Sequence, residues 1–270
     1  MIYKKNKLKI DGFDVGSLGR KYKTPIYCYS LKKIKDNIQN LNNHFKKINP
    51  LICYAVKANT NLGILKEIKN HNLGADVVSV GELMKALRAG IKPQKIVFSG
   101  VGKTATEIEY AVGKNILLIN AESKSEILEI EKIAKRKKKI VDVGLRLNPN
   151  TDAKTLSQIS TGKKENKFGV NEKIFFELIN YCKNSKNIDL KCLSVHIGSQ
   201  ILDYKPYEKM LKVIDKIINK TNYKFEFIDL GGGMGISYDD NSKKLNYKKY
   251  NFAIKKFLEK HKSKIIFGTS

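Results

Sequence analysis

The sequence predicts an α/β fold, a (β/α)8 TIM-like barrel, from three observations. Short apolar runs alternate with longer amphipathic stretches along most of the 270 residues, a pattern typical of parallel α/β proteins. There are eight such runs, and eight strand–helix units in about this length favour a closed barrel over an open doubly wound sheet. The hydrophobic fraction of 41% is sufficient for a large buried core.

The first 50 residues precede this repeating pattern. Thr24–Tyr29 predicts a short strand, and helical spacing of apolar residues predicts a helix from Leu31 to Phe45. We expect residues 1–24 to form an N-terminal segment and residues 25–270 to form the barrel.

The rest of the chain supplies the strands and helices of the barrel. Residues 148–170 are a polar loop that is too long to be a simple connection. The predicted strands are Leu51–Val56, Ala75–Val78, Ile96–Phe98, Ile116–Asn120, Val141–Leu147, Leu190–His196, Phe225–Leu230 and Lys264–Phe267. The predicted helices include Leu62–His71, Glu82–Ala89, Lys124–Lys137, Lys173–Lys183, Tyr207–Lys220 and Tyr247–His261.

The chain is strongly basic, with a formal net charge of +26. Such a charge suggests nucleic acid or an acidic membrane surface as a partner. However, the 52 basic residues include only four arginines, and the lysines are spread over many predicted helices. We therefore expect a solvated lysine-rich surface, with no nucleic-acid or membrane partner, and nucleic-acid binding remains a distant alternative.

Targeting, cysteine and metal signals are weak. The N-terminus has no apolar stretch of a signal peptide, and no run of 18 apolar residues is present. Cys28, Cys53 and Cys192 fall in strand-like runs and are interpreted as small buried thiols, as expected in a reducing cytoplasm. The four histidines have no paired spacing, so no metal site is expected.

Polar residues follow most of the predicted strands. In a (β/α)8 barrel the chemistry lies at the carboxyl ends of the strands, so these residues converge on one mouth. They are Lys57, Asp76, Ser79, Ser99, Asn120, Arg146, Asn148, His196, Ser199 and Gly231–Gly233.

Lys57 is the first candidate for chemistry. A lysine at the end of an apolar strand can be partly desolvated, which lowers the pKa of the amine and makes it nucleophilic. The alternative is that it is one more surface lysine, and its position at the barrel mouth makes the two interpretations equally strong.

A glycine run, Gly231–Gly233, directly follows the seventh strand. Successive backbone N–H groups without side chains can approach and hold a phosphate, although a tight turn is the alternative. The run is not a dinucleotide fingerprint, because the third glycine would fall on Ile236. Nor is Gly100–Thr104 the end of a P-loop, because the required first glycine would fall on Val97.

Three further residues have both a functional and a structural interpretation. His196 can stack on a cofactor ring or move protons, but a lone histidine is more often structural. Ser199 can donate a hydrogen bond to a phosphate. Glu82 is either a site acid or an acid at a helix start, where it is favourable to the helix dipole.

Together, a series of short motifs resembles the diaminopimelate decarboxylases, within the wider group of barrel-type decarboxylases that use pyridoxal 5'-phosphate (PLP). The resemblance extends from about residue 8 to residue 267. The matching motifs are Thr24–Tyr27, Tyr54–Asn59, Gly74–Leu83, Phe98–Lys103, Ile119–Ser123, Arg146–Asn150, Ile159–Gly162, Lys167–Gly169, His196–Gln200 and Asp229–Gly235.

The resemblance implies a role for each matching residue. Lys57 would carry PLP covalently, and His196 would lie against the ring of the cofactor. Ser199 and Gly231, Gly232 and Gly233 would bind the phosphate. Asp76 and Glu82 would be acids near the cofactor, and Arg146 an arginine near its ring. The reaction implied is decarboxylation of meso-diaminopimelate to L-lysine and CO₂, by a homodimer in the full-length family.

The chain also departs from the family pattern. It ends at Ser270, before the Glu-Pro-Gly-Arg motif and the C-terminal β-domain that supplies a proton-donating cysteine and a tyrosine. Residues 1–24 would pack on that β-domain. Leu156 replaces a histidine often found before Ile-Ser-Thr-Gly. Alternatives are a PLP-binding barrel without catalysis, an inactive fragment, a decarboxylase of another basic amino acid, and an amino-acid racemase.

Overall fold

A computed structural model describes residues 2–150, 168–238 and 244–269. The chain divides into two compact units, Met1–His44 and Phe45–Ser270. The predicted motifs at Ile159–Gly162 and Lys167, and Leu156, lie outside the described residues. The boundary expected near residue 24 remains a prediction.

The first unit contains a small antiparallel sheet and two helices. Its sheet has the order β1 (Ile2–Lys4), β2 (Lys7–Ile10) and β3 (Phe13–Asp14). Helix α1 (Val15–Tyr22) begins where the Asp14 carboxylate accepts a hydrogen bond from the Ser17 N–H at 2.6 Å. Helix α2 (Leu31–Phe45) has the bounds that the sequence predicts.

The strand predicted at Thr24–Tyr29 is wrong. In the described residues this segment forms no ladder with another strand. Its aromatic side chains have little to pack against, because Tyr27 is 90% exposed and Tyr29 is 51% exposed. An extended segment without a hydrogen-bonded neighbour or a buried face is not stabilised as a strand. Cys28 is accordingly only partly buried.

The second unit confirms the predicted barrel. Eight strands of the described chain close in the order β10-β11-β4-β5-β6-β7-β8-β9, and every pairing in the ring is parallel. The strands are β4 (Leu51–Ala55), β5 (Gly74–Val77), β6 (Ile96–Phe98), β7 (Leu118–Ala121), β8 (Val141–Arg146), β9 (Ile188–Ser194), β10 (Phe227–Asp229) and β11 (Lys264–Thr269).

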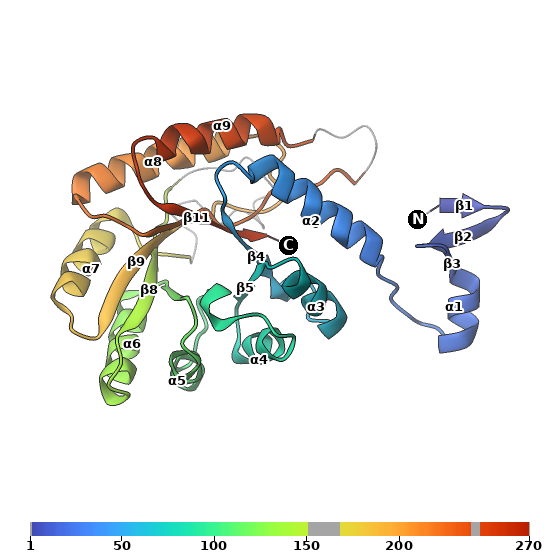
Figure 1. The fold of residues 1–270 in the computed structure, drawn as a ribbon. Coiled ribbons are helices and arrows are strands. Elements are labelled where there is room, and N and C mark those ends of the chain that lie inside the picture. Colours follow the sequence, from blue (N-terminus) through green and yellow to red (C-terminus); the bar gives the residue numbers. More distant parts are fainter. Residues whose placement is uncertain (1, 151–167, 239–243, 270) are drawn as a thin grey trace. The chain divides into compact units, whose positions relative to one another are not determined.

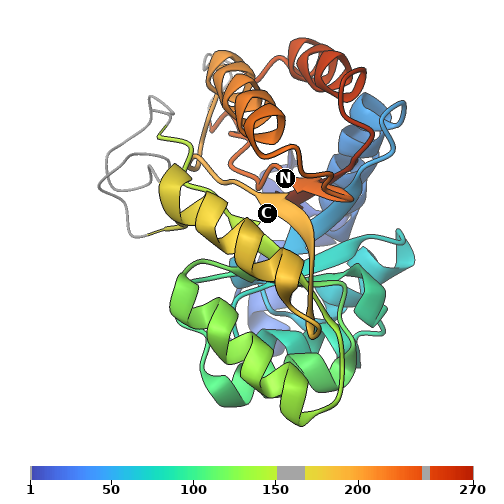
Figure 2. The ribbon, with the colours of Figure 1, turned by 90° about the vertical axis from the view of Figure 1, so that its left-hand side faces the viewer.

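Helices run along the outside of the barrel (Figure 1). Helices α8 and α9, orange to red, lie side by side in both views (Figure 1 and Figure 2). Short 3-10 turns are η1 (Val56–Ala58) and η2 (Pro93–Lys95). The helices are α3 (Leu62–Asn70), α4 (Val80–Arg88), α5 (Ala105–Lys114), α6 (Lys124–Arg136), α7 (Glu172–Asn184), α8 (Lys205–Thr221) and α9 (Tyr247–Leu258).

Apolar periodicity explains how helices and strands share one core. Ile127, Ile130 and Ile133 of α6 are at most 1% exposed, as their helical spacing predicts. A cluster of apolar side chains from six strands fills part of the barrel interior, and it confirms that Cys53 and Cys192 are buried thiols. Its members are Cys53, Val97, Leu118, Cys192, Phe227 and Ile266.

Within the described residues, no helix has both the length and the apolar character needed to cross a membrane. The same residues contain no cluster of three or more histidine, cysteine or acidic side chains arranged to hold a metal ion.

Candidate active site at the barrel mouth

Lys57 lies just beyond β4, in the turn η1. Its side chain is exposed, so the desolvation expected from the sequence is not seen. Its positive charge nevertheless acts on the pKa values of both Asp76 and His196. Since charges act strongly only over short distances in a protein, the structure brings these three predicted site residues together.

Asp76 lies on β5, in register with Ala55 of β4 and Val97 of β6. Burial raises the pKa of its carboxyl group to about 7, and the nearby Asp229 carboxylate adds to this effect. A hydrogen bond with Ser99 and the cationic Lys57 and Arg146 oppose it. Its Oδ1 is buried and makes no hydrogen bond with the described residues. Asp76 therefore holds a proton at this atom or its neighbour for about half the time near neutral pH.

A row of hydrogen-bonded polar side chains crosses the interior of the barrel below the mouth. The Asp229 Oδ2 accepts hydrogen bonds from Asn120 Nδ2 at 2.8 Å and from Ser194 Oγ at 2.9 Å. Asn120 Nδ2 also lies 3.4 Å from Ser99 Oγ. Burial raises the pKa of Asp229, while its hydrogen bonds lower it. The row connects β10, β9, β7 and the end of β6, so it fixes strand ends that are distant in sequence.

Arg146, at the end of β8, is 9% exposed and forms an ion pair with Glu122. Its Nη1 donates to Glu122 Oε1 at 2.9 Å. Glu122 also accepts the Gly100 N–H at Oε1, at 3.0 Å, and the Gly169 N–H at Oε2, at 3.2 Å. The guanidinium carbon of Arg146 lies 4.8 Å from the centre of the Phe168 ring. Two backbone N–H groups therefore fix the Glu122 carboxylate, and this carboxylate and the Phe168 ring hold the Arg146 guanidinium.

Glu122 has a place in the site that the sequence interpretation missed. It is 6% exposed and directly follows β7. The available signal was its position, because it follows a strand end as Lys57 follows β4. A buried carboxylate in such a position requires a cationic partner, and Arg146 at the next strand end is that partner.

His196 follows β9, and its ring contacts the glycine loop after β10. Its Nδ1 accepts the Gly232 N–H at 3.2 Å. Burial lowers the pKa of the imidazole to about 3, and the positive charges of Arg146 and Lys57 contribute. The ring is therefore neutral at physiological pH, and because Nδ1 accepts a hydrogen bond, Nε2 carries the proton.

The glycine loop lies too close to its neighbours for side chains. A Cβ on Gly232 would lie 1.9 Å from the Gly268 carbonyl oxygen, and a Cβ on Gly233 would lie 1.9 Å from the Gly198 carbonyl oxygen. Gly231 and Gly233 also have positive φ angles, +62° and +78°. The loop is therefore a close-packed cradle of backbone between β9, β10 and β11.

The N–H groups of this loop are not all available to a ligand. The Gly231 N–H donates to Asp229 Oδ1 at 2.9 Å, and that of Gly232 donates to His196. The N–H groups of Gly233 and Met234 have no acceptor among the described residues. Ser199, on the neighbouring loop, is exposed. An anion at this place would meet Gly233 and Met234 rather than three successive glycine N–H groups.

Glu82 has the structural role that the sequence left open. Its Oε2 accepts the Val78 N–H at 2.9 Å, and its own N–H donates to Ser79 Oγ at 3.3 Å. Ser79 is thus the N-cap of α4, and the Glu82 carboxylate reaches back to the residue before this cap, close to the pattern of a capping box. A role beside a cofactor remains a prediction for Glu82.

The groups at the barrel mouth suit an aldehyde cofactor that carries a phosphate. It provides an exposed primary amine, a neutral imidazole, a fixed guanidinium and a backbone cradle that only glycine can form. The buried Asp76 Oδ1 is a polar atom that a ligand could pair with.

Known proteins share this barrel and its motifs. Residues 31–267 match the family described as pyridoxal-dependent decarboxylase, pyridoxal binding domain. The chain belongs to this family, whose cofactor is PLP. The diaminopimelate decarboxylase of Helicobacter pylori strain J99 is 46% identical over 244 residues, which are 89% of this chain and 60% of that protein. That of Aquifex aeolicus is 37% identical over 268 residues, 98% of this chain and 63% of that protein.

Solved structures agree with the sequence relatives. The H. pylori diaminopimelate decarboxylase complexed with L-lysine has a TM-score of 0.90 at 42% identity, covering 95% of this chain and 66% of that one. The diaminopimelate decarboxylase of M. jannaschi has a TM-score of 0.90 at 32% identity, covering 99% and 65%. The chain thus spans about 60% of the length of the curated relatives it matches.

Proposed function

We propose that this chain is the PLP-binding barrel of a decarboxylase that converts meso-diaminopimelate to L-lysine and CO₂. The observation that carries the proposal is the convergence of Lys57, Asp76 and His196 at one barrel mouth, where Lys57 and Arg146 act on the pKa values of the other two. A primary amine beside a neutral imidazole and a fixed cation is a suitable site for an aldehyde cofactor that carries negative charge.

Each predicted residue has a role in holding PLP. Lys57 supplies the amine that binds the aldehyde, and His196 lies against the ring. Arg146 would lie near the ring, and Asp76 and Glu82 would supply nearby acids. Ser199 and the loop Gly231–Gly233 would hold the phosphate, with the N–H groups of Gly233 and Met234 as the donors of that loop. When bound, PLP accepts the electron pair that remains on the α-carbon as CO₂ departs.

The protein's own groups prepare the mouth for this chemistry. His196 stays neutral, so it adds no charge to a site that already contains the cations Lys57 and Arg146. Glu122 keeps the Arg146 guanidinium in place. Asp76, whose pKa is about 7, can hold or release a proton at a carboxyl oxygen without a large change in pH.

The substrate is proposed from the relatives and from the motif His196–Gln200. To test it, we would load the purified chain with PLP and supply meso-diaminopimelate, L-lysine or L-ornithine in separate reactions. We expect CO₂ only from meso-diaminopimelate, with one L-lysine formed for each CO₂. Faster release of CO₂ from ornithine or lysine would assign the barrel to another basic amino acid.

Assembly and location belong to the same proposal. We infer that the full-length protein is a homodimer in the cytoplasm, with residues 25–270 as the barrel and residues 1–24 packing on a second, β-rich domain. Sedimentation equilibrium measures the dimer directly, and a monomer at micromolar concentration would contradict it.

A further inference from the structure

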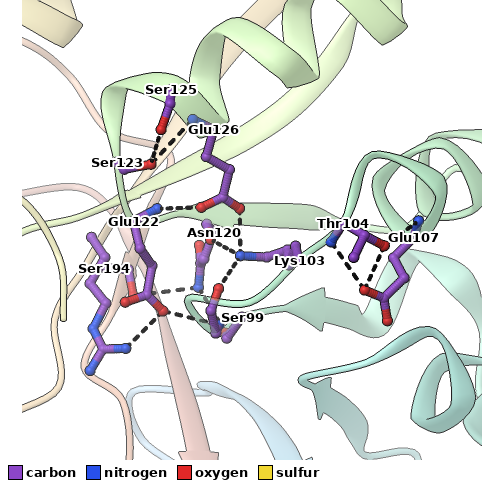
Figure 3. A network of polar contacts seen from close by, with 12 residues as sticks. Ser99, Lys103, Thr104, Glu107, Asn120, Glu122, Ser123, Ser125, Glu126 and Ser194 are labelled. Carbon is purple, nitrogen blue, oxygen red and sulfur yellow. Dashed lines mark hydrogen bonds and ion pairs between the residues drawn. The ribbon is translucent and has the colours of Figure 1, made fainter. Parts of the chain in front are cut away.

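Lys103 is a lysine whose side chain is wholly buried, at 0% exposure. It follows β6 and lies one residue before Thr104, the N-cap of α5. Its Nζ donates to the carbonyl oxygens of Gly100 at 2.5 Å and Asn120 at 2.9 Å. It also forms an ion pair with Glu126 Oε1, at 2.5 Å. In Figure 3 the ammonium points between Glu126 and Asn120.

Burying a charge is unfavourable unless it is paired and hydrogen-bonded. Here the two anions, Glu122 and Glu126, are neighbours, and each has its own cation, Arg146 for Glu122 and Lys103 for Glu126, so the buried charges balance. Burial raises the pKa of Glu126, and the Lys103 ammonium opposes that rise. Glu126 Oε2 also accepts the Glu122 N–H at 3.0 Å. The four side chains therefore form one network rather than two separate pairs.

The peptide groups of Gly100 connect the two halves of this network. The Gly100 carbonyl oxygen accepts from Lys103, and its N–H donates to Glu122 Oε1. Gly100 has a φ of +101°, which favours glycine. When Lys103 holds the carbonyl, the loop after β6 presents its N–H to Glu122, and Glu122 in turn holds Arg146.

We propose that Lys103 and Glu126 are positioning residues for the cofactor site, acting through Gly100 and Glu122 on the orientation of Arg146. This inference rests on the proposed function, because it assumes that Arg146 meets the cofactor. Lys103 does not contact the ligand in this account. Lys103 fixes the loop at Gly100, and Gly100 donates to the Glu122 carboxylate. This carboxylate then orients the Arg146 guanidinium.

Lys103→Met removes the ammonium and keeps an unbranched side chain of similar length. The Gly100 loop then loses its anchor, and Glu126 is left as an uncompensated buried carboxylate. We expect the dissociation constant for PLP to rise about tenfold, as when groups that orient ligand-binding side chains are removed. Hydrogen exchange should also become faster in peptides covering residues 96–104, with no PLP present.

Glu131→Gln is the matched control, because Glu131 lies on the same helix, α6. It accepts hydrogen bonds from Tyr181 and Ser185, which tie α6 to the region of α7. Its loss weakens the fold without touching the loop after β6. We expect PLP affinity to change by less than about twofold, since the two sites share no partner. All variants are compared at a temperature at which circular dichroism shows them folded.

A double-mutant cycle separates positioning from general destabilisation. In a Glu122→Gln background, Lys103→Met should weaken PLP binding little further, because the link to Arg146 is already broken. If Lys103→Met does not fold, the isosteric Glu126→Gln takes its place in the same cycle, with weakened PLP binding expected again.

The outcomes distinguish the inference from the function on which it rests. If the wild-type chain does not bind PLP, the proposed function fails and the inference fails with it. If the wild type and Lys103→Met bind PLP equally well, the inference alone is overturned. The same holds if the effects of Lys103→Met and Glu122→Gln on PLP affinity are fully additive.

Discussion

At the scale of single residues, burial decides the charge of the groups at the barrel mouth. In water a histidine is partly protonated and an aspartate is fully ionised near neutral pH. Here His196, with a pKa of about 3, is neutral, and Asp76, with a pKa of about 7, is only half ionised. The two shifts share a cause, because desolvation disfavours the charged form of either group. His196 therefore adds no positive charge to the site.

The Asp76 shift predicts a pH-dependent stability difference between the wild type and Asp76→Asn. The folded pKa of about 7 lies above the ordinary 3.8, so the folded state binds more protons than the unfolded state between these values. The wild type therefore loses stability as pH rises through this window, whereas the isosteric asparagine does not titrate. Since the residue retains some accessible surface, we expect a loss on the order of 2 kcal/mol.

Urea unfolding of both proteins between pH 4 and pH 8 measures this difference. The free energy of unfolding of Asp76→Asn should rise relative to that of the wild type as pH increases to about 7. Above this pH the difference between the two proteins should stay constant. His196 is present in both proteins, so its own titration largely cancels. A gap that does not change with pH would show that Asp76 titrates normally in the folded protein.

At the scale of elements, the spacing of apolar residues and the residues at turns decide which strands can be predicted from the sequence. All eight barrel strands were predictable because each is an apolar run with polar ends, and their bounds in the structure differ by only a few residues. The hairpins of β1 to β3 were missed, although Asp11 and Gly12 both have positive φ, as a tight hairpin turn requires. These strands are at most 4 residues long, so the alternation of Leu8 and Ile10 with lysines in β2 was too short to reveal them. The strand predicted at Thr24–Tyr29 was wrong because this apolar run pairs with no neighbouring strand in the described residues.

The contact between the loop after β10 and strand β11 predicts a large effect for one small substitution. In Gly232→Ala the added methyl group would meet the Gly268 carbonyl oxygen, where its Cβ would lie at 1.9 Å. Backbone cannot give way as a flexible side chain does, so we expect a loss of about 3 kcal/mol in the free energy of unfolding.

Gly113→Ala is the comparison for this substitution. Gly113 lies in α5, and a Cβ there would have no neighbour within 4 Å. Alanine should stabilise the exposed helix by about 0.5–1 kcal/mol. Urea denaturation should therefore move the two variants in opposite directions. Equal stability of Gly232→Ala and the wild type would mean that the glycine loop and β11 are not in close contact.

At the scale of the whole molecule, barrel closure makes one site from residues that are far apart in sequence. Lys57 follows β4 and Asp229 ends β10, two strands that only β11 separates in the ring, although the two residues are 172 positions apart in the sequence. The carboxyl-end rule for barrels predicted which residues meet, but not how they pair. Glu122 was missed for this reason, because its significance depends on Arg146 and Gly100, which only the folded ring brings to it.

The central claim is that Lys57 carries PLP at this mouth. The most direct measurement is borohydride reduction of the PLP-treated chain, followed by peptide mass analysis, on the wild type, on Lys57→Ala and on Lys66→Ala. Lys66 is an exposed lysine of α3 and serves as the control. We predict one cofactor fixed on the Lys57 peptide in the wild type and in Lys66→Ala, and none in Lys57→Ala. Cofactor fixed on other lysines, or unchanged in Lys57→Ala, would contradict the claim.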